Sequence, residues 1–426
     1  MPDTFLTVAK AGAVLVLQVG IVPLLVWFER KASAYMQDRT GPNRADIFGI
    51  RLAGLVHPIA DVVKLIFKED LTPPQVRLFY YRLAPVLALA VALMPLAVVP
   101  FADAVPGGFS FQVLDLDVGI LYILAVGSFG VFGIIFAGWG SNNKYSLLGG
   151  MRASAQMISY ELAMGLAIVG VIMTYGTLEL NGMVTYQGGL LWGFLPRWGV
   201  FVQPLAAVLF FASALAETNR NPFDLPEGES EIVGFHVEYS SMKFAAFFMG
   251  EYAHIIASAA VFTTLFLGGW QIPWLPTDVL RSGAGTVLAV LFASGTVLGI
   301  LFAVLSLKWR KSLRRLYDDR RRFEGDLFFW ISLLSAAASA ALLVSGFWKG
   351  LSPAGSAAAA AVLQILCFGA KVVFVSFSFI WVRWTLPRFR YDQLMDLGWK
   401  NLVPLALANL VATAAVLAAL HGTGNG

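Results

Sequence analysis

Residues 118–138, VGILYILAVGSFGVFGIIFAG, contain no charged side chain in 21 positions. A helix needs about 20 predominantly apolar residues to cross the hydrocarbon core of a bilayer. Nine other charge-poor stretches have a similar length, so we expect ten spans: 8–28, 83–100, 118–138, 156–175, 198–216, 244–268, 284–307, 327–348, 360–382 and 402–420. The strands of a membrane β-barrel alternate polar and apolar residues, whereas these runs are continuously apolar. The sequence therefore predicts an all-α polytopic membrane protein.

The composition agrees with this fold class and excludes several functions. The chain is 58% hydrophobic and 13% charged, which is typical of an integral membrane protein. Glu29, Arg30 and Lys31 follow the first apolar run in place of a signal-peptide cleavage site. A single cysteine, Cys367, excludes disulfides and iron–sulfur ligation by this chain. The histidines lack metal-site spacing and no nucleotide-binding motif occurs, so we expect no metal, and nucleic acid is not an expected partner.

Lysine and arginine are distributed unevenly between alternate loops. Five loops hold 25 of the 30 basic residues: 29–82, 139–155, 217–243, 308–326 and 383–400. Because basic loops remain on the cytoplasmic side of a membrane, we expect these five to be cytoplasmic. Both termini are then predicted on the non-cytoplasmic side.

The first cytoplasmic loop contains a second kind of helix. Its apolar residues recur at helical spacing: Leu52, Leu55, Val56, Ile59, Val62, Val63, Ile66 and Phe67. The opposite face carries His57, Asp61, Lys64 and Lys68. This pattern predicts an amphipathic helix on the membrane surface. It either anchors at the lipid interface or forms a cavity wall, and the side-by-side spacing of Asp61 and Lys64 favours the wall.

Acidic residues are concentrated in the cytoplasmic loop between the fifth and sixth expected spans. Six carboxylates lie within 22 residues: Glu217, Asp224, Glu227, Glu229, Glu231 and Glu238. Desolvation and mutual repulsion disfavour the charged forms of carboxylates crowded beside hydrocarbon. The cluster is therefore either a solvated acidic loop or a set of groups that exchange protons near a buried cavity.

Ionisable residues also occur inside the expected spans. Glu161 lies in the fourth, Glu251 and Tyr252 in the sixth, and Lys371 in the ninth. A charge at the centre of a membrane helix costs about 2.5–3.5 kcal/mol on insertion scales, so such residues usually face a bundle interior or a wet pathway. We interpret Glu161 and Glu251 as functional. For Lys371, snorkelling to the interface or pairing with an acid is an equal alternative.

Two segments carry a specific resemblance to a known family. They are AETNRNPFDLPEGESEIVGFHVEY (216–239) and LPRFRYDQLMDLGWK (386–400). Both closely resemble the H subunit family of bacterial NADH–quinone oxidoreductase (respiratory complex I), the counterpart of the first mitochondrially encoded membrane subunit. ERKASAYMQDRTGPNR (29–44), ADVVKLIFKED (60–70), GWGSNNKYSLLGGMRASAQMISYE (138–161) and FFMGEYAHI (247–255) agree in order. The resemblance covers roughly 1–270 and 360–420.

The resemblance implies a division of the chain into three parts. Family members usually have about eight spans, which correspond here to a core of 1–270 and a last part of 360–426. The residues between them, 271–359, would then be an insertion with the two extra expected spans. A second departure is the third span, 118–138, which lacks the carboxylate that some relatives carry there.

The resemblance also assigns roles to particular residues. Family members line a quinone cavity and connect it to proton-pumping subunits through buried carboxylates. The implied cavity and funnel residues are Glu29, Arg30, Asp61, Lys64, Glu217, Phe223, Asp224, Glu227, Glu229 and Glu231. The implied proton path contains Glu161, Glu251, Tyr252 and Lys371, and the loop at the arm interface contains Arg388, Arg390 and Asp392. Glu227, Glu229 and Glu231 belong to a loop that we expect to couple reduction to pumping by adopting two arrangements.

The resemblance further implies where the complex works and with what. Quinone is the expected substrate, whereas flavin and iron–sulfur clusters are expected on partner subunits. The expected partners are the quinone-site and iron–sulfur subunits of the hydrophilic arm, other membrane-arm subunits, and the lipid of the bacterial cytoplasmic membrane. Two alternatives remain at this point. One is the equivalent subunit of a membrane-bound hydrogenase or a ferredoxin- or coenzyme-linked dehydrogenase, and the other is a stand-alone cation-coupled transporter.

Overall fold

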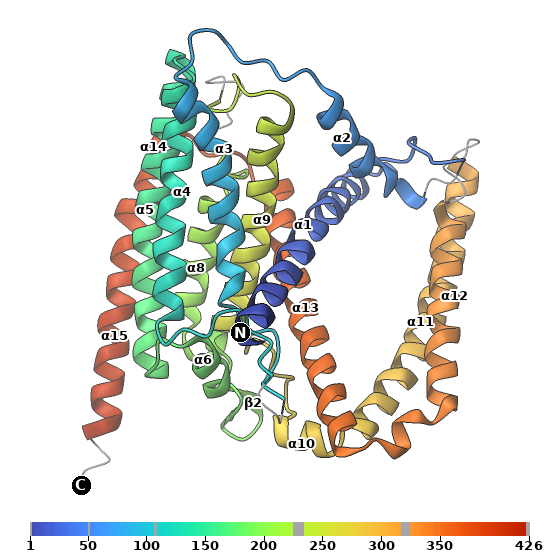
Figure 1. The fold of residues 1–426 in the computed structure, drawn as a ribbon. Coiled ribbons are helices and arrows are strands. Elements are labelled where there is room, and N and C mark those ends of the chain that lie inside the picture. Colours follow the sequence, from blue (N-terminus) through green and yellow to red (C-terminus); the bar gives the residue numbers. More distant parts are fainter. Residues whose placement is uncertain (1, 50–51, 106–108, 225–233, 317–323, 423–426) are drawn as a thin grey trace.

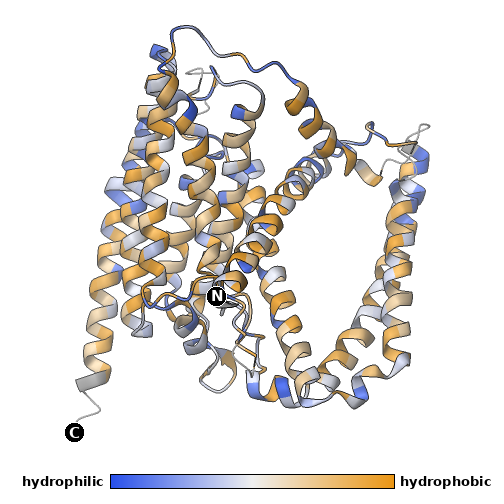
Figure 2. Ribbon diagram, viewed as in Figure 1, coloured by the Kyte–Doolittle hydropathy of each residue, from blue (hydrophilic) through white to orange (hydrophobic). Residues whose placement is uncertain are grey.

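The computed structural model describes residues 2–49, 52–105, 109–224, 234–316 and 324–422, and most of them are helical (Figure 1). Within these ranges, nine helices are long and apolar enough to cross a membrane. They are α1 (Pro2–Met36), α3 (Leu78–Leu93, continued by η2, Met94–Ala97), α4 (Gly119–Gly140), α5 (Lys144–Tyr175), α9 (Ser241–Phe266), α11 (Ala284–Leu316), α12 (Glu324–Ser345), α13 (Pro353–Thr385), and the continuous run of α14 (Tyr391–Asp396), η5 (Leu397–Leu402) and α15 (Val403–Gly422). Figure 2 shows that apolar residues dominate along these helices. The predicted all-α polytopic fold is confirmed.

The fifth expected span, 198–216, differs from a continuous membrane helix. It consists of α7 (Gly199–Val202) and α8 (Pro204–Glu217), and α8 has only 14 residues. The break occurs at Gln203, whose φ of −133° and ψ of 61° are not helical. A proline ring clashes with an α-helical residue directly before it, so Pro204 starts a new helix. The structure therefore has nine long helices and one short, broken one where we expected ten continuous spans.

The central bundle consists of α3, α4, α5, α8 and α9, with α1, α13 and α15 around it (Figure 1). Small residues let its helices approach closely, as expected for membrane bundles. A Cβ added to Gly133 of α4, for example, would lie 3.1 Å from the Ala88 backbone nitrogen of α3. Large side chains such as Tyr160 and Phe266 are fully buried in the bundle core.

The amphipathic helix predicted in the first loop is present as α2 (Val56–Phe67), preceded by the short η1 (Leu52–Gly54). The hydroxyl of Ser241, at the start of α9, donates a hydrogen bond of 2.9 Å to the Leu65 carbonyl oxygen of α2. Most of its apolar side chains nevertheless remain exposed: Ile59, Val62, Val63, Ile66 and Phe67. Exposed apolar residues on one helix are consistent with a position at the lipid interface.

The helices α11 and α12 form a hairpin that stands apart from the bundle in Figure 1. Gly299 lets them pack closely, since an added Cβ would lie 2.8 Å from the Ala336 Cβ. At one end the hairpin adjoins α10 (Thr277–Ser282), η4 (Phe347–Gly350) and α13. At the other end Glu324 forms an ion pair with Lys31 of α1. The hairpin is thus attached to the bundle near both of its ends.

The remaining short elements are α6 (Leu180–Tyr186) and the strands β1 (Leu190–Leu191) and β2 (Leu195–Pro196), which pair in antiparallel register. These elements, the start of α1 and the end of α15 lie toward one end of the molecule, whereas α2, α14, the end of α11 and the start of α12 lie at the other (Figure 1). The basic loops therefore share one end, as the charge distribution predicts. That this end faces the cytoplasm stays a prediction.

Candidate functional site

A series of buried charged groups crosses the bundle, beginning at Glu29 of α1. Its side chain is 6% exposed. One carboxylate oxygen accepts a hydrogen bond of 2.5 Å from Arg383 Nη1 of α13. The other accepts one of 2.8 Å from the Tyr252 hydroxyl of α9. A buried carboxylate requires such partners, because desolvation of an unpaired charge costs several kcal/mol.

The next pair, Arg220 and Glu251, lies beside Tyr252. Arg220 Nη2 is 2.6 Å from Glu251 Oε2, and both side chains are largely buried. The Arg220 guanidinium also lies 4.4 Å from the centre of the Tyr252 ring. A planar guanidinium suits both contacts, because it combines hydrogen bonding to a carboxylate with stacking on an aromatic face. Tyr252 therefore connects the Glu29 pair to the Glu251 pair.

Two small cavities continue the series into the bundle. The first has a volume of about 60 Å³, and its wall includes Glu217, Glu251 and His254. The second has a volume of about 30 Å³, and its wall includes Glu161, Glu217 and His254. A water needs roughly 10–15 Å³ of such space and two or more polar partners. Both cavities are therefore large and polar enough to hold water between the carboxylates.

Glu161 of α5 ends the series. It accepts a hydrogen bond from the Ser128 hydroxyl of α4. The groups from Arg383 to Ser128 thus come from six helices or their ends, and they alternate between direct contacts and cavities. Closely spaced ionisable groups influence one another electrostatically.

This arrangement brings together most of the residues expected on a proton path. Glu161 and Glu251 line the two cavities together with Glu217, which the resemblance assigns to the quinone cavity and funnel. Four further residues of the series are not predicted as site residues from the sequence: Arg383, Arg220, His254 and Ser128. His254 follows Glu251 by three residues, a spacing that places both on one helix face and so gives a usable signal. Arg383 is expected only as a basic residue of a cytoplasmic loop.

The funnel residues of α1 and α2 form a separate, more exposed group. Arg30 Nη1 lies 2.6 Å from Asp61 Oδ2, with both side chains a little over 40% exposed. Asp61 therefore pairs with Arg30 of α1, a contact that the spacing of Asp61 and Lys64 on one helix does not predict. Lys64 is exposed. These residues lie at the end of α1 that also carries Glu29.

The acidic loop is fixed on its amino-terminal flank. Arg388 Nη2 lies 2.6 Å from Asp224 Oδ2, and the Phe389 amide donates a hydrogen bond of 3.2 Å to the Pro222 carbonyl oxygen. Phe223 is buried, and its ring centre lies 5.4 Å from that of Tyr160. The predicted residues Glu227, Glu229 and Glu231 lie outside the described residues.

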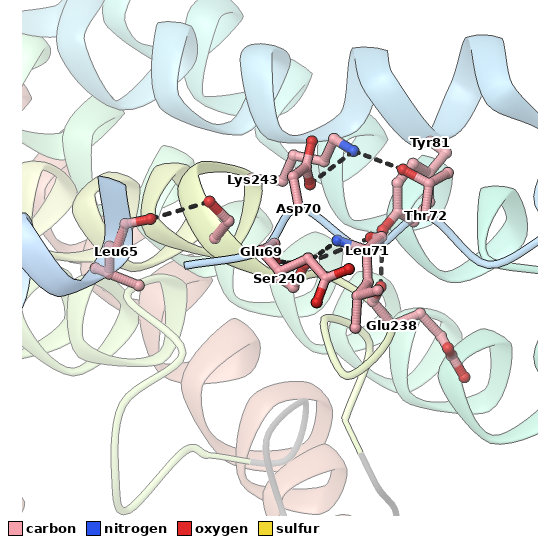
Figure 3. A network of polar contacts seen from close by, with 10 residues as sticks. Leu65, Glu69, Asp70, Leu71, Thr72, Tyr81, Glu238, Ser240 and Lys243 are labelled. Carbon is pink, nitrogen blue, oxygen red and sulfur yellow. Dashed lines mark hydrogen bonds and ion pairs between the residues drawn. The ribbon is translucent and has the colours of Figure 1, made fainter. Parts of the chain in front are cut away.

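The carboxyl-terminal flank of the loop is fixed by the polar network of Figure 3. The Tyr81 hydroxyl donates a hydrogen bond of 2.7 Å to the Glu238 carbonyl oxygen. Lys243 Nζ lies 3.0 Å from Asp70 Oδ1 and donates a hydrogen bond of 2.9 Å to the Thr72 hydroxyl. The Leu71 amide donates one of 2.9 Å to Ser240 Oγ. The acidic loop is thereby tied to the segment that follows α2.

The three residues expected at the arm interface, Arg388, Arg390 and Asp392, take part in two ion pairs. Arg388 contacts the acidic loop as described, whereas Arg390 Nη2 lies 2.9 Å from Asp392 Oδ2. The side chains of this second pair are 71% and 66% exposed. Arg390 and Asp392 therefore lie on the surface, where a partner protein can reach them.

Lys371 lies away from the carboxylates and at the opposite end of the bundle. Its ammonium donates hydrogen bonds to three carbonyl oxygens after the end of α9, those of Leu267 (2.7 Å), Gly269 (2.9 Å) and Gln271 (2.6 Å). It also lies 4.5 Å from the centre of the Trp198 ring. An ammonium has three donors, and all of them are used here. This geometry favours a role in fixing the end of α9 over a place on the proton path.

We expect Lys371→Met to destabilise the protein by about 1.5–3 kcal/mol, the range for a hydrogen bond to a charged group. Three carbonyl oxygens would lose their donor, so the segment after α9 should also exchange its amide hydrogens faster. Thermal unfolding and hydrogen exchange of the purified protein measure both effects. Phe374→Leu, at an exposed position of the same helix, is the control. Unchanged exchange in Lys371→Met would contradict the anchoring role.

Comparison with known proteins identifies the family. The model of the NADH dehydrogenase family matches residues 9–317 and 323–414. An NADH-quinone oxidoreductase H subunit from Solibacter usitatus is 43% identical over 420 residues, which cover 97% of each chain. The H subunit from Bdellovibrio bacteriovorus is 40% identical over 432 residues, covering 96% of this chain and 95% of the relative. An NADH-quinone oxidoreductase subunit from Rhodothermus marinus, numbered 8 in that organism, is 41% identical over 392 residues, covering 92% and 91%.

These alignments extend over nearly the whole chain. Because 97% of this chain aligns with the Solibacter protein, most of 271–359 has a counterpart in that relative. The hairpin of α11 and α12 is therefore not confined to this protein, although the boundaries of the three parts stay a prediction. The chain belongs to the NADH dehydrogenase family and is a membrane-spanning relative of the NADH-quinone oxidoreductase H subunits.

Proposed function

We propose that this chain lines much of the quinone cavity of a proton-translocating NADH–quinone oxidoreductase and couples quinone reduction to proton pumping. The observation that carries the proposal is the series of buried charged groups from Glu29 to Glu161. The two ends of this series lie where a path from a quinone cavity into the membrane requires them. Glu29 is next to Arg30 at the exposed end of α1, whereas Glu161 lies inside the bundle, on α5.

The physical step is a change of charge that moves along coupled groups. Reduction of a quinone to a quinol takes up two protons and alters the charge near the cavity. Glu29 and Tyr252 respond first, because they share a hydrogen bond, and Arg220 passes the change to Glu251. Glu217 and Glu161 follow across the two cavities. Each group responds by changing its protonation or its orientation.

The acidic loop is the part that we expect to respond to the hydrophilic arm. Its flanks are tied to the 386–390 segment on one side and to the segment after α2 on the other. We propose that this loop couples the quinone cavity to the buried carboxylates.

Electron transfer to the quinone requires partner subunits. Cys367, the single cysteine, is half-buried in α13, and one thiol is insufficient to bind an iron–sulfur cluster. We propose that the quinone-site and iron–sulfur subunits of the hydrophilic arm, with the flavin, dock at the end that carries Arg390 and Asp392. Other membrane-arm subunits and the lipid of the bacterial cytoplasmic membrane surround the spans.

The proposal predicts that Glu161→Gln lowers the number of protons pumped per NADH oxidised. Glutamine keeps the size of the side chain and its acceptor for the Ser128 hydroxyl, but it does not carry a proton. We expect coupled proton transfer to fall more than tenfold, a typical effect of removing a group that transfers protons. The measurement is proton uptake by proteoliposomes that contain the assembled complex.

Glu179→Gln is the matched control, because Glu179 directly precedes α6 and lines neither cavity. It should pump protons at the wild-type ratio. If Glu161→Gln, Glu217→Gln and Glu251→Gln all pumped at that ratio as well, the buried series would have no part in proton transfer.

A further inference from the structure

His254 occupies the boundary between the two cavities. Three residues of the described chain line both of them: Gly127, Glu217 and His254. Glu251 lines only the first cavity, and Glu161 lines only the second. A proton that moves through the cavities from Glu251 to Glu161 must therefore pass this boundary.

The boundary has few groups that can carry a proton. Gly127 of α4 has no side chain, and a Cβ added to it would lie 3.3 Å from Glu217 Oε1. Glycine therefore leaves room for the Glu217 carboxylate but supplies no ionisable group. The helix α4 corresponds to the third expected span, 118–138, which contains no carboxylate. Among the residues that line both cavities, Glu217 and His254 are the two with an ionisable side chain.

The geometry of His254 suits intermittent contact with Glu217. Its Nε2 lies 3.6 Å from Glu217 Oε2, whereas a hydrogen bond between such atoms is about 2.7–3.2 Å long. Within the part of the chain that the structure describes, this buried Nε2 has no hydrogen-bond partner. A small rotation of either side chain makes the bond, and the reverse rotation breaks it. The two groups are thus close enough to exchange a proton without being locked together.

We propose that His254 is a relay that passes protons between the two cavities, an inference that rests on the proton path proposed above. An imidazole carries protons because its two nitrogens act in turn as acceptor and donor. A proton arriving at one nitrogen makes the ring cationic, and the proton on the other nitrogen then leaves. The ring returns to its neutral form as the opposite tautomer, and a flip of the ring then restores the starting arrangement for the next proton.

Proton pumping by proteoliposomes with the assembled complex tests the relay through His254→Asn. Asparagine retains a polar amide but does not change its protonation. We expect the protons pumped per NADH to fall more than tenfold, as in Glu161→Gln. His57→Asn is the matched control, because it removes a histidine of α2 that lines neither cavity, and it should pump at the wild-type ratio.

The experiments distinguish an error in the His254 relay from an error in the whole proton path. If Glu161→Gln stops pumping while His254→Asn pumps as wild type, the path stands and the relay is wrong. If His254→Asn, Glu161→Gln, Glu217→Gln and Glu251→Gln all pump as wild type, the path itself is wrong, and the relay with it.

A spectroscopic measurement keeps the test independent of assembly. Infrared difference spectra of the wild-type complex with ring-labelled histidine, recorded on quinone reduction, should show an imidazole band that is absent in His254→Asn and retained in His57→Asn. If His254→Asn does not assemble, the wild-type spectrum and that of His57→Asn decide. Absence of any histidine band from the wild-type spectrum would overturn the relay.

Discussion

Replacement of Arg220 with methionine should destabilise the protein by about 3–5 kcal/mol, the range for removal of one partner from a buried ion pair. The Arg220 and Glu251 side chains are 6% and 13% exposed, so solvent does not replace the lost charge. Methionine occupies a similar volume but leaves Glu251 without its guanidinium. The contact between Arg220 and the Tyr252 ring is also lost. Proton pumping should fall together with stability, because both residues belong to the proposed path.

Thermal unfolding of the purified complex measures the loss. Lys349→Met is the control: Lys349 is exposed and lies far from the proposed arm interface, and such substitutions usually change stability by less than about 0.5 kcal/mol. The double variant Arg220→Met with Glu251→Leu should recover part of the stability, because it removes the uncompensated charge, but it should not pump protons. Wild-type stability in Arg220→Met would show that the ion pair is not needed to hold the bundle together.

The second large effect is expected at the attachment of the α11–α12 hairpin. Glu324 and Lys31 have side chains that are 0% and 4% exposed, and Lys31 Nζ also donates a hydrogen bond of 2.7 Å to the Thr40 carbonyl oxygen. Glu324→Ala leaves the ammonium buried without its carboxylate. We again expect a loss of about 3–5 kcal/mol, with the first turns of α12 exchanging their amide hydrogens faster than in the wild type.

A double-mutant cycle separates the ion pair from simple packing. Lys31→Met combined with Glu324→Leu replaces both charges with apolar groups, and such replacements are often neutral or stabilising. Lys349→Met, an exposed position after the other end of the hairpin, is the control and should have little effect. If the double variant were as unstable as Glu324→Ala, the charges would not be the cause.

The sequence predicts the parts of this molecule that depend on local patterns. Long apolar runs identify the nine long helices, and the helical spacing in 52–67 identifies α2. Pro204 is a local signal for the break before α8, because proline restricts the residue that precedes it. Overall hydropathy outweighs this signal in the sequence and favours one continuous span.

The site itself depends on contacts between distant segments. Charged residues inside spans are conspicuous in a sequence, so Glu161 and Glu251 can be identified there. Their partners cannot, because Glu29 and Arg383 are 354 positions apart and Lys31 and Glu324 are 293 apart. The two cavities arise from packing of α3, α4, α5, α8 and α9, and no single segment contains their pattern.

The pairing of Glu29 with Arg383 has a consequence for biogenesis. The first transmembrane helix enters the bilayer long before the ribosome has synthesised Arg383. During most of translation Glu29 therefore lacks its guanidinium, and the charge is compensated only when α13 has been inserted. A chain that ends before α13 retains the Glu29 carboxylate without this guanidinium, with the Tyr252 hydroxyl of α9 as its remaining partner.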